Sequence, residues 1–402
     1  MTTILNGKSI VLGVTGSIAA FKAADLASKL TQAGASVDVV LTRSAQEFVG
    51  VATFAGLTHG PVSTDLYESN SELGIDHVAL ARRADLILIA PATANVLAKL
   101  AHGITDDVLM ATILAGSQPL AVAPAMDADM YGAAATQANV KTLKERGVYF
   151  IGPESGRLAS GLVGNGRMTE VPEIIGHIRA LLGRDGDMTG RRVVVSAGGT
   201  EEAIDPVRVL TNRSTGKMGY AIAEAARDRG ADVTLISAPS SLPIPACVTL
   251  LPVSSAIEMR DAVQTACADA DLLVMAAAVS DYRPANPADQ KIKKTGDDPL
   301  TIDLIQNPDI IAGVNGNRMV KVAFAAETND LIANADAKVL SKGVDMVVAN
   351  DVSATDSGFG TDTNAVTFVY PGRDPEPMPL LDKVDVGNAL LDRALPLLKQ
   401  YP

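Results

Sequence analysis

Short apolar runs alternate with longer helical patterns from the start of the chain. Runs of strand length lie at 9–14, 37–41, 86–90 and 120–123, and an Ala-rich helical pattern at 19–30 follows the first of them. This alternation predicts a parallel sheet covered by helices. Aromatic residues make up only 3% of the chain and Trp is absent. The core must therefore be built from Ala, Val, Leu and Ile, which suits a sheet buried on both faces.

The same alternation begins again in the second half. The segment LGRDGDMTGRR (182–192) concentrates Gly and charge just before a strand run at 192–196. AGASVDVVLT (33–42) resembles RGADVTLISA (229–238), and RADLILIAPAT (83–93) resembles DADLLVMAAAV (269–279). We therefore predict two doubly wound, mainly parallel α/β domains. A flavodoxin-like or Rossmann-like domain spans 1–182, a linker spans 183–190, and a Rossmann-like domain spans 191–402.

Charge and cysteine content exclude several classes of protein. The 402 residues carry 34 Lys and Arg against 46 Asp and Glu, a net charge of −12 that repels nucleic-acid phosphates. The only cysteines are Cys247 and Cys267, and no apolar run reaches the length of a membrane span. We expect a reduced, soluble, cytoplasmic protein without a membrane or nucleic-acid partner.

A glycine turn in the first half is a candidate anion site. Gly13, Gly16 and Ser17 stand between the first strand and the Ala-rich helix, where backbone N–H groups can receive a phosphate. The spacing is not G-x-G-x-x-G, which favours a mononucleotide over a dinucleotide. Close packing of the helix on the strand is the alternative explanation for the small residues. Thr42 and Ser44 at the next strand end favour a ligand.

Two other polar residues follow or precede strands of the first half. His77, one of four histidines, precedes the strand that ends in APATAN, and Asp127 follows the strand that ends at residue 123. His77 is a candidate acid or base, and an ordinary surface or core histidine is the alternative. Asp127 can equally be a helix N-cap. Spacing alone leaves both questions open.

Several motifs of residues 7–170 together resemble the flavin-containing cysteine decarboxylases. They are GVTGSIAAFK, GIDHVALARRAD around His77, APATANVLAKLAHGITDDVL, PAMDADMYGAAATQ and GNGRM. The resemblance implies FMN bound between subunits of a trimer and His77 as the active-site base. It places these residues near the FMN: Gly16, Ser17, Thr42, Ser44, Ala92, Thr93 and Asn95.

The chain departs from that family at two positions. Asp127 stands where the family pattern P-x-M-N has Asn, and Ser160 stands where a Cys precedes G-x-G-R-M. An ionised Asp127 would repel a substrate carboxylate. We therefore expect burial and the like charge to keep Asp127 protonated, so that it donates a hydrogen bond and supplies the final proton. The alternative is a flavin-binding but catalytically impaired first domain that serves as an oligomerisation scaffold.

The second half has its own anion-binding signals. SAGGTEEAIDPVRVLTNRSTGKMG joins a glycine turn to a polar loop and to a helix that begins near Gly216. KIKK, at 291–294, puts three cations into a half whose net charge is −9. A solvated lysine cluster is the common explanation for such a run. Its position after the strand end AAAVSDYRP favours triphosphate binding.

The resemblance continues over residues 190 to 395, where the second half is similar to the phosphopantothenate–cysteine ligases. The motifs are DPVRVLTNRSTGKMG, AAAVSDYRP, KIKK, NPDI, FAAET and VANDVS. The resemblance implies that Asn212 stabilises an acyl-cytidylate, that Ala277 and Asp281 recognise cytosine, and that Lys291 binds the triphosphate with Mg²⁺. It completes the nucleotide site with Asn307, Pro308, Asp309, Ile310, Phe324, Lys338 and Lys342, and it leaves the metal ligands unknown.

A fusion of two such domains in this order is similar to the bifunctional coenzyme A biosynthesis proteins. The resemblance implies CTP-dependent joining of cysteine to 4'-phosphopantothenate. FMN-dependent decarboxylation and re-reduction to 4'-phosphopantetheine would follow. It also implies a homo-oligomer, a dodecamer of trimers and dimers. A two-domain nicotinamide oxidoreductase is the competing enzyme class, and the missing dinucleotide fingerprint weighs against it.

Overall fold

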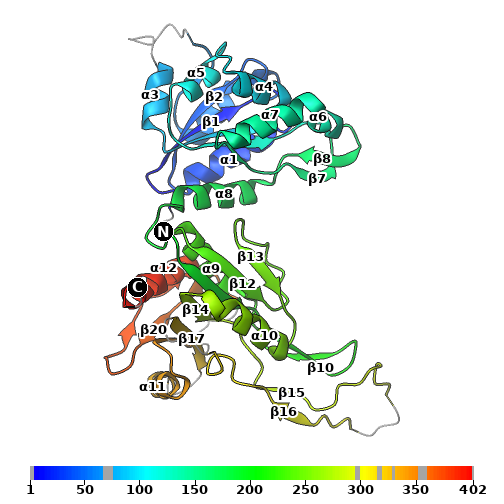
Figure 1. Cartoon of the computed structure of the whole chain (residues 1–402), viewed down its shortest axis with the longest axis vertical. Helices are drawn as coiled ribbons and strands as arrows, with labels where there is room; N and C mark the ends of the chain where they lie inside the picture. The colour runs from blue at the N-terminus through cyan, green and yellow to red at the C-terminus, as the bar shows by residue number, and fades with distance from the viewer. Residues whose placement is uncertain are drawn as a thin grey trace. The chain divides into compact units, whose positions relative to one another are not determined.

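The computed structural model describes residues 4–66, 76–294, 299–314, 319–327, 331–351 and 360–400. The chain divides into two compact units, residues 2–182 and residues 183–402 (Figure 1). Both are doubly wound α/β domains, so the fold class predicted from the alternation of apolar runs is confirmed.

The first unit contains a six-stranded parallel sheet in the order β3-β2-β1-β4-β5-β6. Its strands are β1 (Ser9–Val14), β2 (Ser36–Leu41), β3 (Val62–Ser63), β4 (Leu86–Ala92), β5 (Leu120–Pro124) and β6 (Tyr149–Phe150). Every residue of β4 is buried, as expected for a strand covered on both faces. Val14 pairs with Leu41, and Gly13 pairs with Ile89. The carboxyl ends of β1, β2 and β4 therefore meet at one edge of the sheet.

Helices cover both faces of this sheet. One face packs against α1 (Ala20–Gln32), α2 (Val51–Thr58) and α8 (Val171–Gly183). The other packs against α3 (Asp76–Arg83), α4 (Ala94–His102), α5 (Val108–Leu114) and α7 (Ala134–Glu145). The shorter elements are η1 (Ala45–Glu47), α6 (Ala128–Gly132) and the hairpin β7 (Glu154–Arg157) with β8 (Val163–Arg167).

The second unit contains an eight-stranded sheet in the order β13-β12-β9-β14-β17-β18-β20-β21. The strands are β9 (Arg192–Ala197), β12 (Asp232–Ser237), β13 (Thr249–Pro252), β14 (Leu272–Met275), β17 (Val320–Glu327), β18 (Met346–Asp351), β20 (Val366–Val369) and β21 (Glu376–Pro377). The strands are parallel up to β18, and β20 and β21 are antiparallel additions. Helices α9 (Lys217–Asp228) and α12 (Lys383–Leu398) cover one face, while α10 (Ala256–Ala266) and α11 (Leu331–Lys342) cover the other.

Residues 183–190, predicted as a linker, pack against the second unit. The Met188 side chain is fully buried in the core beneath α9 and α12. A Cβ on Gly183 would lie 1.9 Å from the carbonyl oxygen of Asp228, so the chain passes α9 in close contact. The composition predicted a linker here, but glycine serves at this position to allow the close approach of two backbones.

Two short antiparallel pairs extend from the second unit as arms (Figure 1). They are β10 (Glu201–Ala203) with β11 (Val209–Thr211) and β15 (Tyr282–Pro284) with β16 (Leu304–Gln306). The remaining elements are η2 (Cys267–Asp269) and the pair β19 (Thr363–Asn364) with β22 (Leu381–Asp382). Within the described ranges, no helix combines the length and apolar character needed to cross a membrane.

Candidate functional site

Three turns meet at the carboxyl edge of the first sheet, where the sequence predicts a flavin phosphate. A Cβ on Gly16 would lie 2.5 Å from the Cβ of Ser44, so the turns after β1 and β2 are in contact. The buried Thr15 hydroxyl donates to the carbonyl oxygen of Pro91 over 2.7 Å and accepts from the backbone N–H of Thr93 over 3.3 Å. Thr15 thereby joins the turn after β1 to the turn after β4. The sequence interpretation missed it, although it stands between Gly13 and Gly16.

The predicted cofactor residues are therefore brought together within one chain. Thr42 and Ala92 are buried and form part of the framework of the site, whereas the Ser44 and Asn95 side chains are exposed. Gly16 and Ser17 are half-buried just ahead of α1. Hydroxyls and backbone N–H groups gathered where helices begin suit a phosphate group. The residues present at this edge fit a flavin nucleotide.

Asp127 and Ser160 are in direct contact. Asp127 caps α6, and one of its carboxylate oxygens accepts from the backbone N–H of Asp129 over 3.2 Å. The other oxygen accepts from the Ser160 hydroxyl over 2.5 Å. A Cβ on Gly166 would lie 2.3 Å from the carbonyl oxygen of Met126, so β8 runs closely along the Asp127 turn. Only glycine permits the approach that brings the Ser160 loop to Asp127.

This contact corrects the expectation that burial keeps Asp127 protonated, whereas the effect of a substrate's like charge on Asp127 stays a prediction. The hydrogen bond from Ser160, followed by those from the backbone N–H groups of Asp129 and Ala128, lowers the pKa of Asp127. Asp127 is only half-buried, so desolvation does not outweigh these donors. The carboxylate is therefore ionised at neutral pH in the ligand-free chain.

His77 does not join this pair within one chain. It is a half-buried residue in the first turn of α3. In Figure 1, α3 lies at the side of the first unit opposite the hairpin β7–β8. A role for His77 as base at Asp127 and Ser160 stays a prediction, and it needs a contribution from outside this chain.

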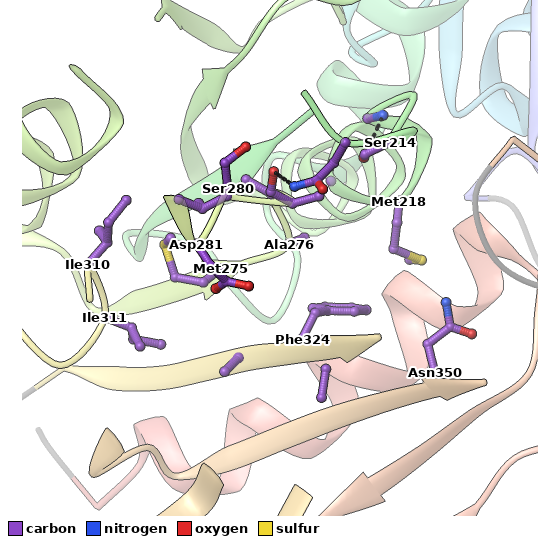
Figure 2. Close-up of a pocket in the computed structure, with 18 of the residues that line it drawn as sticks. Ser214, Met218, Met275, Ala276, Ser280, Asp281, Ile310, Ile311, Phe324 and Asn350 are labelled. Carbon is purple, nitrogen blue, oxygen red and sulfur yellow. Dashed lines mark hydrogen bonds between the residues drawn. The ribbon is translucent and has the colours of Figure 1, made fainter. Parts of the chain in front are cut away.

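A cavity of about 750 Å³ opens at the carboxyl edge of the second sheet. In Figure 2, Ile310 and Ile311 lie at one side, Met218 and Asn350 lie at the other, and Phe324 lies between them. The cavity gathers ten residues predicted for the ligase: Asn212, Ala277, Asp281, Asn307, Pro308, Asp309, Ile310, Phe324, Lys338 and Lys342.

Hydrogen bonds between loops set the shape of this cavity. The Asn212 side-chain amide donates to the carbonyl oxygen of Ala278 over 2.9 Å. The Asn307 side-chain amide donates to the carbonyl oxygen of Ser280 over 2.8 Å. The backbone N–H of Ala277 donates to the Ser196 hydroxyl over 3.1 Å, which ties the loop to β9. Residues far apart in the chain are therefore held around one space.

Lysines stand at two ends of the cavity. At the first end, Lys342 pairs with Asp309 at 3.2 Å, and the Lys338 ammonium donates to the carbonyl oxygen of Phe324 over 3.1 Å. The second end contains Lys217 and Lys383, which the sequence interpretation missed. Lys217 directly follows Ser-Thr-Gly in the polar loop before α9, and this position could have indicated a ligand-binding residue. Lys383 stands in LDKVD, which has no such signal.

Lys291 is not among the residues that line the cavity. It is exposed, and its neighbour Ile292 is held by the arms: the backbone N–H of Ile292 donates to Asp205 over 3.1 Å, and its carbonyl oxygen accepts from Arg208 over 3.0 Å. Nearness in sequence to a strand end suggested a place in the site, but the arm carries this segment outward. Triphosphate binding by Lys291 stays a prediction.

In the part of the chain that the structure describes, no group of three or more His, Cys, Asp or Glu side chains could hold a metal ion. Asp281 and Asp309 are the described carboxylates that line the cavity. Mg²⁺ commonly binds through one or two carboxylates together with substrate phosphates. This donor set therefore fits Mg²⁺ only when a nucleotide supplies most of the ligands.

Two family models match the chain and divide it between them. The model described as Flavoprotein matches residues 2–183. The model described as DNA/pantothenate metabolism flavoprotein C-terminal domain matches residues 188–397.

Curated relatives match the chain over its whole length. The coenzyme A biosynthesis bifunctional protein CoaBC of Vibrio vulnificus (strain YJ016) is 44% identical over 391 residues, which cover 96% of this chain and 97% of that protein. The protein of the same name from Bacillus subtilis (strain 168) is 43% identical over 402 residues, which cover 99% of both chains. A crystal structure of the C-terminal domain of a CoaBC protein is 35% identical, covers 54% of this chain and 99% of that chain, and has a TM-score of 0.46.

Proposed function

This chain belongs to the coenzyme A biosynthesis bifunctional protein family, and from that premise we propose that its ligase unit uses CTP and its decarboxylase unit uses FMN. The chain is a bifunctional enzyme of coenzyme A biosynthesis, with a flavoprotein decarboxylase domain followed by a ligase domain. The nucleotide, the particular flavin, the residue roles and the assembly are the proposal.

The cavity that joins Asn212 to Asp281 carries the ligase proposal. The carboxylate of 4'-phosphopantothenate attacks the α-phosphorus of CTP, the bond to the bridging oxygen breaks, and pyrophosphate leaves. The amine of cysteine then attacks the acyl carbon, an amide forms, and CMP and a proton are released. Asn212 is the donor near the acyl phosphate. A donor aimed at developing charge commonly contributes ~2.7–4 kcal/mol to such a step.

Asp281 supports the choice of base. Its carboxylate is exposed toward the cavity and can accept hydrogen bonds only. Cytosine presents an exocyclic amine that donates, whereas uracil presents a carbonyl oxygen at the same place. Adenine also carries an exocyclic amine, so size must separate ATP from CTP. Phe324 and the backbone of Ala277 border the same space.

The test of the ligase proposal compares three nucleotides. Purified chain is given 4'-phosphopantothenate, cysteine and either CTP, ATP or UTP, and pyrophosphate is followed. We expect turnover with CTP, little with ATP and none with UTP, and we expect Asp281→Asn to lose discrimination against UTP. Equal rates with UTP and CTP in the unmodified chain would contradict the role of Asp281.

FMN fits the carboxyl edge of the first sheet. Its phosphate would lie at Gly16, Ser17 and Ser44, and its ring would lie near Thr93 and Asn95. When bound, FMN supplies a temporary acceptor for the electron pair that makes loss of CO₂ possible. Purified protein with flavin absorbance, lost in a Gly16→Leu variant that keeps its fold, would support this placement.

In the decarboxylase unit, Ser160 and Asp127 act on protons. The ionised Asp127 accepts a hydrogen bond from the Ser160 hydroxyl. It can take a proton from a substrate group that reaches the two residues. The same carboxyl can return that proton once the substrate has lost CO₂. Decarboxylation consumes one further proton overall, which must come from water, and the partly exposed Asp127 carboxyl can take that proton up and pass it on.

A silent first domain remains the second candidate, and the ionised state of Asp127 favours it. A fixed negative charge repels the carboxylate that the reaction must remove. Supplying phosphopantothenoylcysteine to the purified chain and measuring CO₂ separates the two candidates. Release of CO₂ at enzymatic rates removes the silent-domain candidate. No release, followed by activity in an Asp127→Asn, Ser160→Cys double variant, would establish it.

Exposed apolar side chains support assembly in both units. Ile18 and Phe21, beside the predicted flavin phosphate, are 59% and 62% exposed. On the arms, Val209 and Ile305 are 44% and 42% exposed. Apolar groups in such positions are typical of contacts between subunits. We expect trimeric first units and dimeric second units, and a dodecamer in light scattering. Phe21→Asp should leave dimers and Ile305→Asp should leave trimers.

A further inference from the structure

The hairpin β7–β8, which carries Ser160, buries almost none of its own side chains. The structure describes every residue of the hairpin, and Gly166 is the buried one among them, whereas Val163 is 78% exposed. In Figure 1 the hairpin lies beside α6 at the side of the first unit. A two-stranded hairpin is only marginally stable in water by itself. The contact between Ser160 and Asp127 therefore depends on polar groups that keep the hairpin closed.

Arg167, the last residue of β8, makes the strongest polar contacts of the hairpin. Its guanidinium donates to the Glu154 carboxylate in β7 over 2.8 Å and lies 3.5 Å from the Glu170 carboxylate. A Cβ on Gly156 would lie 3.0 Å from Nε of Arg167, so glycine leaves the room that the guanidinium occupies against β7. Arg167 thereby joins both strands at their base and the segment that follows them.

Lys22 connects this base to α1. Its ammonium donates to the Glu170 carboxylate over 2.9 Å and to the carbonyl oxygen of Met168 over 3.3 Å. Helix α1 is itself fixed, because side chains such as Leu26 are fully buried in the core. Four charged residues thus form one chain of ion pairs, which we call the hairpin clamp: Lys22, Glu170, Arg167 and Glu154. Such a network contributes more than isolated surface pairs do.

Strand β8 carries the clamp to the Asp127 turn. The backbone N–H of Met126 donates to the carbonyl oxygen of Gly166 over 3.0 Å. A Cβ on Gly164 would lie 2.6 Å from the Cβ of Ala128. These glycines permit the close approach of the strand, but they supply no side chain to hold it there. The attraction must come from backbone hydrogen bonds and from the clamp.

The charges around Arg167 indicate that its loss would be felt. Glu173, in the first turn of α8, also lies near the clamp, since burial first and then the charge of Glu154 raises its pKa. Without Arg167, Lys22 would be the remaining cation of the clamp, and the carboxylates would repel one another. Removing one partner from a partly buried ion pair costs more than the pair contributes when it is intact.

We propose that Arg167 is a positioning residue of the decarboxylase unit: the hairpin clamp keeps β7–β8 closed and thereby keeps Ser160 on Asp127. This inference rests on the proposed proton-transfer role of these two residues. When the clamp is broken, the hairpin opens and the Ser160 hydroxyl leaves the carboxylate. Arg167 acts through Ser160 and needs no contact with substrate or flavin.

The test digests the full chain with trypsin under native conditions. Arg157 is an exposed residue of β7, and a protease reaches a strand backbone only after local opening. We expect Arg167→Met to raise the rate of the cut after Arg157, identified by fragment mass, about fivefold or more, and Arg167→Lys to restore part of the protection. The matched control is Arg83→Met, which breaks a 2.8 Å ion pair with Asp38 elsewhere in the first unit and should stay within about twofold.

The lysine of the clamp and the salt concentration give a second measurement. Lys22→Met should raise the same cut about threefold, whereas Lys29→Met, which breaks a pair with Asp25 on the same helix, should leave it unchanged. Raising NaCl from about 0.05 M to about 0.5 M should speed the cut in the unmodified chain and not in Arg167→Met, because salt screens ion pairs. An unfolded reference peptide corrects for the activity of trypsin. If Arg167→Met does not fold, Lys22→Met and Glu170→Gln carry the test.

Turnover separates positioning from a general structural role. Ser160→Ala and Arg167→Met should each lower the rate of CO₂ release about tenfold, and the double variant should be no slower than Ser160→Ala alone, because both changes remove one contact. All three variants should keep their flavin absorbance, since the residues at the ends of β1, β2 and β4 are untouched.

Three outcomes would overturn the inference. The cut after Arg157 could be as slow in Arg167→Met as in the unmodified chain. Arg83→Met could speed it equally, which would indicate a general loss of stability. The double variant could lose the product of both single effects, which would give Arg167 a role apart from Ser160. Failure of the decarboxylase proposal is distinct, because an unmodified chain that releases no CO₂ still shows by proteolysis whether the clamp closes the hairpin.

Discussion

Both units place polar residues at the carboxyl ends of doubly wound sheets, and in the second unit most of the predicted residues line one described cavity. In the second unit, residues from Asn212 to Lys342 surround one space. In the first unit, the flavin residues lie at the ends of β1, β2 and β4, and the pair Asp127 and Ser160 lies at the hairpin β7–β8. Helix α3, which carries His77, lies on the side of the unit opposite this hairpin (Figure 1).

The difference follows from what covers the sheet edge. In the second unit, β17, β18 and the arms add chain around the carboxyl ends of the central strands, and loop-to-loop hydrogen bonds close the site. In the first unit the sheet has β6 as its last strand. Apolar side chains such as Phe21, in the first turn of α1, remain exposed beside the carboxyl edge of that sheet. A doubly wound fold thus fixes where a site forms, while the segments added around it decide whether one chain can complete the site.

The largest expected effect tests whether the units unfold separately. Phe54 in α2 and Phe368 in β20 are fully buried. Replacing either with Ala should cost about 3–5 kcal/mol of unfolding free energy in its own unit, because burial and packing are lost together. In a urea titration monitored by limited proteolysis, the unfolding transition of the substituted unit should move to lower urea concentration. The transition of the other unit should stay in place. Equal shifts of both transitions in either variant would mean that the units unfold together.

The next effect separates the two activities. Asn212→Ala should lower pyrophosphate release about 100- to 1,000-fold, because an amide donor at the developing charge is removed. Release of CO₂ from supplied phosphopantothenoylcysteine should remain unchanged. The control for loss of an amide is Asn388→Ala on α12. The Asn388 side-chain amide donates to the carbonyl oxygen of Val384 in the same helix over 3.2 Å. A parallel loss of both activities in Asn212→Ala would contradict separate sites.

Asp205 in the second unit and Glu173 in the first unit should respond to acid with opposite sign. Hydrogen bonds from Arg208 hold the pKa of Asp205 well below its usual range, so this carboxylate stabilises the second unit above pH ~4 and loses that effect as the pH falls further. Burial first, and then the charge of Glu154, raises the pKa of Glu173. Glu173 therefore destabilises the first unit when ionised, and acidification relieves the cost. Thermal unfolding from pH 7 to pH 3 measures both contributions. Compared with the unmodified chain, Asp205→Asn should lose less stability in the second unit on acidification, and Glu173→Gln should lose more stability in the first unit. A variant whose pH dependence matches that of the unmodified chain would contradict its assignment.

The smallest effect compares helix caps. Thr93 accepts from the backbone N–H of Val96 at the start of α4, and Ser255 accepts from that of Glu258 at the start of α10. Ala at either position should cost about 1 kcal/mol, since one backbone donor loses its partner. Ser255→Ala should cost less, because the Glu258 carboxylate still accepts from the backbone N–H of Ser254 over 2.7 Å and keeps a second bond at that helix start. Equal losses in thermal unfolding would assign no role to that second bond.

The sequence predicted the central strands closely because burial on both faces leaves an unbroken apolar run. The runs at 9–14 and 192–196 became β1 (Ser9–Val14) and β9 (Arg192–Ala197), and the helix expected near Gly216 begins at Lys217. The edge strands β3 and β6 have only two residues each. They depend on neighbouring strands rather than on their own pattern, so the sequence did not reveal them.

Site residues could be predicted where a motif keeps them together. Asn307 to Ile310 form one loop, and the structure places all four at the cavity. Lys291 also belongs to a recognisable motif, yet the arm carries its segment away from the cavity. A motif therefore predicts chemistry more securely than position, because position depends on the path of the chain after the strand ends.

The sequence alone determined the two doubly wound domains, since the periodicity of burial is a local property of the chain. It also determined which residue types stand at the strand ends. Only the tertiary structure lowers the pKa of Asp127 further through a hydrogen bond from Ser160, because glycine contacts along β8 bring Ser160 to it from 33 residues away. Only the tertiary structure brought Lys217 and Lys383 together, because α9 and α12 pack on the same face of one sheet. Charge state and proximity depend on neighbours in space, and a linear pattern does not record them.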